Sequence, residues 1–389
     1  MVGKVLADYG AQVIAIESEE QIRKGFGSRH PGSGAADLTS LNLGNIFNKF
    51  NTNKLSFSLN LRYPEAQEVA RNLVKVSHVV ITSFLPGALK RLGISYEELV
   101  KVKPDIIMLT MPAFGIEGPY KGYRTLSWNL LAMCGFDHMT TSTGRSPIRA
   151  SPYSHPDTSS QPFHGMVALL AALNHWFETG KGQLIELSQY ESTLNFTETL
   201  VFDYLVNGRL RKPPANKSHG AAPQGVYCCK GDDQWCAIAV FTDREWESLC
   251  SVVGREDLLK DARFTTAAGR ESNSDELDAI INGWTVDRVS WEVMDRMQAA
   301  GVASGVVENV EDIMRRDPQL KARRHWIKIK HPDAGEMTVE DWAFKLSGVP
   351  DLKWRHAPLL GEHRDYVCSE VLGMTEQQIN DLIVKGVFS

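Results

Sequence analysis

Asp157 is the residue of this sequence whose type and position could do chemistry. It is a single carboxylate in the polar stretch His155-Pro156-Asp157-Thr158, just ahead of a long apolar segment at residues 163–177. An aspartate is ionised at pH 7 and can attack an electrophilic carbonyl carbon without the help of a base. An aspartate ahead of a helix is more often a turn or capping residue, and the local pattern alone favours that interpretation.

Regular elements are expected to hold Asp157 in place. Pro162 suits the first turn of a helix, and Gly180 suits its end. Residues 183–188 favour a strand. We therefore expect Asp157 in a loop ahead of a buried helix, a place where reactive groups are often found. The predicted helix carries one stripe of side chains, formed by Val167, Leu170, Ala171 and Asn174.

The composition is that of an ordinary globular protein. The 389 residues are 43% hydrophobic and 23% charged, with a formal net charge of −5. This length is enough for two domains, and this charge gives no reason to expect a nucleic-acid or membrane surface. The N-terminus has no signal-peptide core, and no apolar run is long enough to span a membrane. The six cysteines form no C-x-x-C pair and have no zinc spacing, so we expect a cytoplasmic protein with reduced thiols and no metal.

Strands and helices alternate through the first half of the chain. This order predicts an α/β fold with a doubly wound, parallel, Rossmann-like sheet. Ligands of such sheets bind beyond the carboxyl ends of the strands. The expected strands are residues 12–18, 55–61, 78–84 and 105–111, and the expected helices are residues 2–9, 64–76 and 96–102.

A second, smaller α+β domain is predicted after a linker-like Arg211-Lys212-Pro213-Pro214. Residues 226–240 favour a hairpin, and helices are expected near residues 243–253, 274–283 and 290–300. The predicted organisation is a large domain at residues 1–210, a small domain at 211–310, and a C-terminal segment at 311–389 that returns to the large domain.

Several sequence blocks follow one another along nearly the whole chain. The block that begins at Asp157 continues through Leu170-Ala171-Ala172-Leu173, Thr179-Gly180-Lys181-Gly182-Gln183 and Ser188-Gln189-Tyr190-Glu191. The others are residues 6–17, 51–60, 84–93, 114–120 and 357–363. Together these blocks resemble the class III CoA-transferases, whose superfamily also includes the α-methylacyl-CoA racemases. The interval from Asp157 to the Leu-Ala-Ala-Leu run is one residue longer than is usual for that family.

The resemblance implies a role for Asp157. In that family an aspartate at this place is the covalent nucleophile, which reverses the capping interpretation. The chain would then move CoA from an acyl-CoA to a free carboxylic acid through an aspartyl-CoA thioester. CoA would be a substrate, with no permanently bound cofactor. Which acids are exchanged is not readable, although Trp128, Phe136, Met139 and Tyr153 suggest the hypothesis of a bulky or aromatic acyl group.

The resemblance also suggests CoA contacts. Arg91 is the first candidate for a phosphate contact and Lys54 the second, although a single surface cation is more often simply solvated. A loop of the small domain, residues 219–225, is a candidate cover for the site. Further predicted CoA contacts are Asn53, Phe84, Pro86 and Gly87, and predicted site-lining residues are Trp128, His155 and Gly220.

Departures from the family keep two alternatives open. A racemase of this superfamily carries a His-Asp pair where this chain has Leu126 and Ser127, so a racemase is disfavoured. Asn129 replaces an acidic residue. The chain begins inside the family's first helix, so the family's first strand and its Gly-Pro turn are expected to be absent, through truncation, supply by a partner chain, or an altered fold. A non-catalytic, CoA-binding subunit paired with an active paralogue is therefore the other alternative. The family forms interlocked dimers, so a homodimer or heterodimer is expected.

Overall fold

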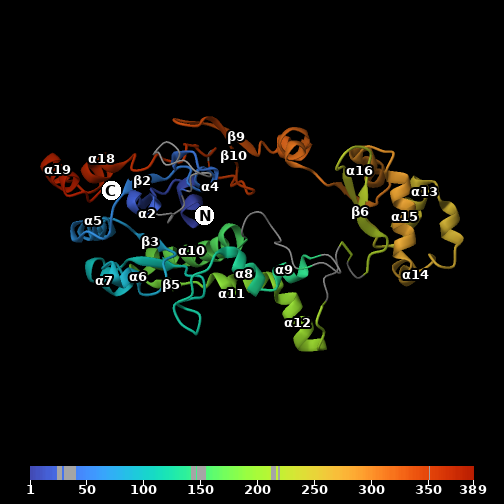
Figure 1. Cartoon of the computed structure of the whole chain (residues 1–389), viewed down its shortest axis with the longest axis horizontal. Helices are drawn as coiled ribbons and strands as arrows, with labels where there is room; N and C mark the ends of the chain where they lie inside the picture. Colours follow the sequence, from blue (N-terminus) through green and yellow to red (C-terminus); the bar gives the residue numbers. More distant parts are fainter. Residues whose placement is uncertain are drawn as a thin grey trace. The chain divides into compact units, whose positions relative to one another are not determined.

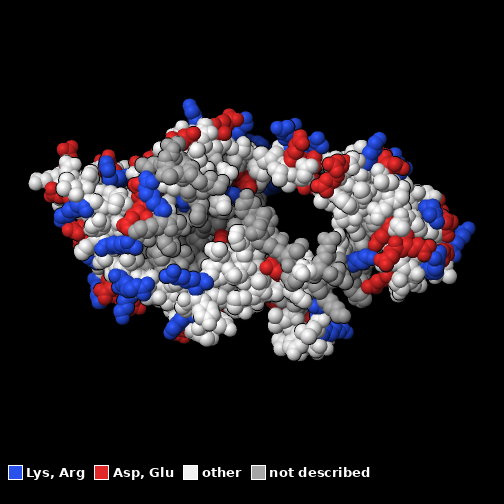
Figure 2. Space-filling view, viewed as in Figure 1, with Lys and Arg blue, Asp and Glu red and all other residues white. Residues whose placement is uncertain are grey.

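The structure is a computed structural model in which the chain divides into two compact units. One unit comprises Met1–His138, Ile148–Arg211 and Arg324–Ser389, and the other comprises Met139–Pro147 and Lys212–Arg323. On the face shown in Figure 2, basic and acidic side chains are interspersed. None of the helices in the described parts has the length and apolarity that a membrane crossing requires. The structure describes residues 1–23, 29, 41–141, 146, 155–211, 216–217, 220–349 and 351–389.

The first unit contains two parallel sheets. Strand β1 (Ile14–Glu17) pairs with β2 (Leu55–Ser58), and β4 (Ile107–Thr110) lies between β3 (Val79–Thr82) and β5 (Leu184–Glu186). The predicted parallel α/β architecture is confirmed. The finer prediction of one doubly wound sheet that lacks its first strand stays a prediction. Within the described ranges, β1 and β3 each pair with a strand on one side only.

Strand β4 forms the centre of its sheet because it pairs with β3 along one edge and with β5 along the other. All four of its residues are buried, which is typical of a parallel strand between helical layers. The neighbouring β5 approaches closely at its start. A Cβ atom at Gly182 would lie 2.2 Å from the carbonyl oxygen of Ile106, so only glycine fits there.

Helices of the first unit connect and cover these strands (Figure 1). Those before residue 140 are α1 (Val2–Asp8), α2 (Glu19–Arg23), α4 (Asn45–Phe50), α5 (Pro64–Lys75), α6 (Ala88–Arg91), α7 (Tyr96–Val102), α8 (Ser127–Met133) and α9 (Phe136–Met139). Those after residue 155 are α10 (Gln161–Thr179), α11 (Gln189–Leu194), α12 (Glu198–Asn207), α18 (Arg364–Tyr366) and α19 (Glu376–Val384). A hairpin of β9 (Trp326–His331) and β10 (Gly335–Glu340), which the sequence did not predict, also belongs to this unit.

Helix α10 corrects two predictions. Asp157 does not lie in a loop, because Pro156–Ser160 forms a π-helical turn that runs directly into α10. The predicted stripe is also not the buried face, since Val167 is 71% exposed and Leu170 is 54% exposed. The face that α10 buries depends on the small Gly165, because an added Cβ there would lie 3.3 Å from both Val2 and Met111. The buried apolar residues of α10 are instead Pro162, Gly165, Met166, Leu169 and Ala172.

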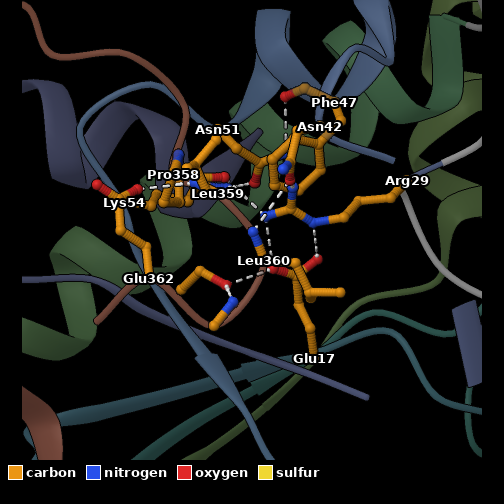
Figure 3. A network of polar contacts seen from close by, with 12 residues as sticks. Glu17, Arg29, Asn42, Phe47, Asn51, Lys54, Pro358, Leu359, Leu360 and Glu362 are labelled. Carbon is orange, nitrogen blue, oxygen red and sulfur yellow. Dashed lines mark hydrogen bonds and ion pairs between the residues drawn. The ribbon is translucent and has the colours of Figure 1, made fainter. Parts of the chain in front are cut away.

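A buried arginine joins distant segments of the first unit. The Arg29 guanidinium donates to both carboxylate oxygens of Glu17, at 2.9 and 3.1 Å, and to the carbonyl oxygen of Pro358 at 2.8 Å (Figure 3). It also lies over the ring of Phe47, 3.6 Å from the centroid. Because a buried guanidinium requires acceptors for its donors, this arrangement fixes the end of β1 against the C-terminal segment.

The second unit is an antiparallel sheet with helices. Strand β7 (Trp235–Ala239) lies between β6 (Gln224–Cys228) and β8 (Ala303–Val306). The predicted hairpin of β6 and β7 is confirmed, and β8 adds a third strand that the sequence did not predict. The α-helices of this unit are α13 (Asp243–Val253), α14 (Ala267–Ser272), α15 (Ser274–Thr285), α16 (Ser290–Ala299) and α17 (Pro318–Ala322).

Candidate active site

Asp157 presents its carboxylate to solvent from the π-helical turn ahead of α10. The residue is exposed, and the hydroxyl of Ser127 donates a hydrogen bond to its Oδ2 atom. Desolvation by the surrounding protein raises the pKa of this carboxyl above its ordinary value of 3.8, while the bond from Ser127 and the Met1 amino group oppose that shift. Asp157 is therefore a reachable carboxylate whose charge is less well solvated than in water.

Two glutamines hold this turn at the carboxyl end of β4. The side-chain amides of Gln161 and Gln189 donate to the carbonyl oxygen of Met111, at 3.5 and 3.0 Å. Ser160, the last residue of the turn, is hydrogen-bonded to the hydroxyl of Thr193 at 3.0 Å. The carboxylate is thus placed where ligands of parallel α/β sheets bind.

Ser127 owes its position to the start of α8. It is the first residue of this helix, and the side-chain oxygen of Asn129 accepts a hydrogen bond from the backbone N–H of Leu126 at 3.2 Å. Asn129 thereby caps the start of the helix. The sequence could not reveal the contact of Ser127 with Asp157, because the two residues are 30 positions apart.

Lys54 is the predicted cation whose ammonium group is desolvated. Burial first of all, and then the charge of Lys4, lower the pKa of its ammonium group to about 8. Its Nζ atom donates to Asn51 Oδ1 at 2.8 Å. Burial lowers the pKa of the Met1 amino group to about 5, and the charges of both Lys54 and Asp157 also act on that group. The amino-terminal end of α1 therefore lies within electrostatic reach of both residues.

Asn53 is held inside the protein, at the amino end of β2. Its amide nitrogen donates to Asp8 at 2.7 Å, and its amide oxygen accepts from the backbone N–H of Arg355 at 2.8 Å. The side chain is buried, with a backbone φ of 62°. Asn53 also lines a cleft of about 400 Å³ at the starts of β1 and β2. Contact between Asn53 and CoA stays a prediction. It would require Asn53 to bind CoA while keeping its hydrogen bonds to Asp8 and Arg355.

The predicted turn for CoA follows the carboxyl end of β3, which is the strand beside β4. Phe84 is 51% exposed, and Gly87 precedes α6 with a left-handed φ of 80° that favours glycine. Arg91 ends α6 and is exposed, and its guanidinium lies over Gly87. Pro86 is half-buried in the same turn. These residues and Asp157 therefore follow neighbouring strand ends of one sheet.

The other predicted site residues lie in different places. Trp128 follows Ser127 and is 41% exposed, and the ring of His155 lies 5.6 Å from that of Phe136. Gly220 belongs to the second unit, with a φ of 91°. Within the described ranges, no group of three His, Cys, Asp or Glu residues is placed to hold a metal. The predictions for Tyr153, His219, and the segment Lys212-Pro213-Pro214 fall outside the described residues.

Comparisons with known proteins match one protein family along nearly the whole chain. The model of "CoA-transferase family III" matches residues 1–364. A succinyl-CoA–D-citramalate CoA-transferase of Chloroflexus aurantiacus is 30% identical over 99% of this chain and 93% of its own length. A probable CoA-transferase of Mycobacterium tuberculosis is also 30% identical over 99% of this chain, which spans 48% of that relative.

A solved structure has the same fold. The crystal structure of a CAIB/BAIF family protein from Brucella suis superimposes with a TM-score of 0.84, at 27% identity, over 95% of this chain and 94% of that protein. The similarity in structure thus extends over both units, as does the similarity in sequence.

Proposed function

The chain belongs to CoA-transferase family III, and from this premise we propose that it moves CoA from an acyl-CoA donor to a free carboxylic acid through a covalent bond to Asp157. The observation that carries the proposal is the exposed Asp157 carboxylate at the carboxyl end of β4, with the Ser127 hydroxyl on one of its oxygens. Desolvation of the carboxylate supports the proposal, because a poorly solvated anion is a better nucleophile.

The proposed reaction has two halves. The carboxylate attacks the thioester carbonyl carbon, a C–O bond forms, and the C–S bond breaks to give a mixed anhydride and CoA thiolate. The thiolate then attacks the Asp157 carbonyl carbon and expels the donor acid, which leaves an aspartyl-CoA thioester. An acceptor acid reverses both steps and departs as its CoA thioester. Neither half requires a redox or metal cofactor, since every step is an acyl transfer.

CoA contacts are proposed on the edge that holds Asp157. The turn after β3 offers a cation, an apolar surface and an exposed glycine, which suit a phosphate and an adenine; its residues are Phe84, Pro86, Gly87 and Arg91. Lys54 adds a buried ammonium group, and binding of an anion would hold it protonated. Trp128 and His155 flank the turn of Asp157, and we propose Trp128 and Phe136 as contacts for a bulky acyl group. Asn53 and Gly220 remain weaker proposals.

A dimer is proposed because the first unit exposes apolar helix faces. In α12, Leu205 is 68% exposed and Val206 is 77% exposed, while in α10 Phe177 is 77% exposed. Such faces are typical of surfaces that a second chain covers. Mass measurement in solution should give a dimer that Leu205→Asp with Val206→Asp weakens, and a monomeric wild-type chain would reject the proposal. A dimer containing a related second chain would instead indicate the heterodimer.

The decisive test of function is mass spectrometry after mixing the protein with a panel of acyl-CoA thioesters. We expect a CoA adduct that hydroxylamine removes, located by peptide mapping at Asp157 and absent from Asp157→Asn. CoA binding with no adduct from any thioester would reject the proposal and favour the non-catalytic subunit. Exchange of the α-proton of an acyl-CoA, in place of CoA transfer, would favour the racemase.

A further inference from the structure

The two oxygens of the Asp157 carboxylate are not equivalent. Oδ2 accepts the hydroxyl hydrogen of Ser127, and no hydrogen bond to Oδ1 comes from the residues that the structure describes. Ser127 is itself fixed at the first position of α8, where Asn129 caps the helix. An oxygen that already accepts a hydrogen bond is the weaker nucleophile of the two, because the bond stabilises its charge.

We propose that Ser127 is a catalytic residue that gives these oxygens separate roles within each turnover: the oxygen without the Ser127 hydrogen bond, here Oδ1, attacks, and the oxygen that holds it, here Oδ2, becomes the oxyanion. The proposal rests on the proposed function and adds a residue to it. When Oδ1 attacks the acyl-CoA, Oδ2 becomes the carbonyl oxygen of the anhydride. When CoA thiolate then adds to the Asp157 carbonyl carbon, the electron pair moves onto Oδ2, where the Ser127 O–H already points.

This arrangement provides the donor that such an intermediate needs. A donor placed before the charge develops stabilises the transition state without reorganisation, and loss of one such donor costs about 10²-fold in kcat. Collapse of the intermediate breaks the bond from carbon to Oδ1, so Oδ1 leaves in the released acid. The acceptor acid then brings one of its own oxygens into the same position. Each turnover therefore replaces Oδ1 and leaves Oδ2 in place.

The rate at which the aspartyl-CoA forms tests the role of Ser127 directly. The protein is mixed with saturating acyl-CoA, the reaction is stopped at short times, and the CoA adduct on the peptide that contains Asp157 is measured by mass spectrometry. We expect Ser127→Ala to form the adduct about 10²-fold more slowly than the wild-type protein, with an unchanged KM for acyl-CoA. Ser127→Thr keeps the hydroxyl and should recover most of the rate.

Each result has a defined meaning. A wild-type rate of adduct formation in Ser127→Ala would overturn the proposal. So would a loss in Ser127→Thr as large as that in Ser127→Ala, when both variants unfold at the wild-type temperature. A wild-type protein that forms no adduct would instead reject the covalent function. The matched control is Ser159→Ala, the same change in the turn of Asp157 at a residue with no hydrogen bond to the carboxylate. It should retain wild-type kcat, while Ser127→Ala loses about 10²-fold.

Discussion

Asp8 and Asp157 are aspartates of one unit whose carboxylates are used in opposite ways. Asp8 is almost completely buried, and four side chains donate to it: Lys4 at 2.7 Å, Thr52 at 3.2 Å, Asn53 at 2.7 Å and Trp342 at 3.0 Å. Asp157 is exposed and accepts one side-chain hydrogen bond, from Ser127.

The difference separates a structural carboxylate from a reactive one. A carboxylate has about four lone-pair directions, so the donors around Asp8 leave none free to form a bond to carbon. They connect α1, the start of β2 and the segment after β10, which makes Asp8 a junction between segments. Asp157 retains free lone pairs and is incompletely solvated, and both properties favour attack on an acyl group.

Removal of the reactive carboxylate should give the largest effect. Asp157→Asn should lower the rate of CoA transfer by at least about 10⁴-fold, because a nucleophile cannot be replaced by its neighbours. Thermal unfolding should be unchanged or shifted to a higher temperature, since a desolvated charge is lost. An Asp157→Asn protein that is active would show that Asp157 is not the reactive carboxylate.

Removal of the structural carboxylate should act on stability. Asp8→Asn should lower the free energy of unfolding by about 3–5 kcal/mol, because it leaves the buried Lys4 ammonium without its counter-charge. Urea titration measures this loss. The control is Asp365→Asn, which removes a carboxylate that is 76% exposed beside Arg364 and should cost less than about 1 kcal/mol. Equal losses in the two variants would show that Asp8 is not a junction.

CoA binding offers a test beside the reactive carboxylate. Arg91→Gln should raise the KM for acyl-CoA by about 10-fold with little change in kcat, because a charge-assisted bond to a phosphate is lost. Lys101→Gln is the control, as it removes another exposed cation, on α7, that is paired with Glu98. A KM that Lys101→Gln raises equally would indicate a general charge effect.

The pH dependence should be the smallest effect, and its direction follows from the raised pKa of Asp157. Attack requires the ionised form, so the rate of adduct formation should be constant at neutral pH and fall as the pH drops through a value above 3.8. Because folding raises this pKa, ionised Asp157 lowers stability at neutral pH, and that penalty disappears in acid. In Ser127→Ala the rate should fall at a higher pH, since an opposing hydrogen bond is lost. A midpoint at or below 3.8 would contradict the desolvation.

The sequence predicted the regular elements better than the contacts. Periodicity and end signals located β3, β4, α7 and α13 to within a few residues, because these elements carry strong local patterns. It failed at α10, where apolar side chains lie on both sides and the small Gly165 decides which one packs. The sequence named Ser127 only as a departure from the racemases and did not indicate its hydrogen bond to Asp157. A contact across 30 residues depends on how two helices meet.

The buried Arg29 has a consequence for synthesis of the protein. It joins Glu17, near the start of the chain, to Pro358, which lies 329 residues after Arg29, whereas the second unit is mostly the continuous stretch from Lys212 to Arg323. Since domains fold as units while the chain is made, we expect the second unit to fold on the ribosome before the first. The first unit must then wait with its packing incomplete until its last segment emerges, and during that interval chaperones would have their greatest opportunity to bind.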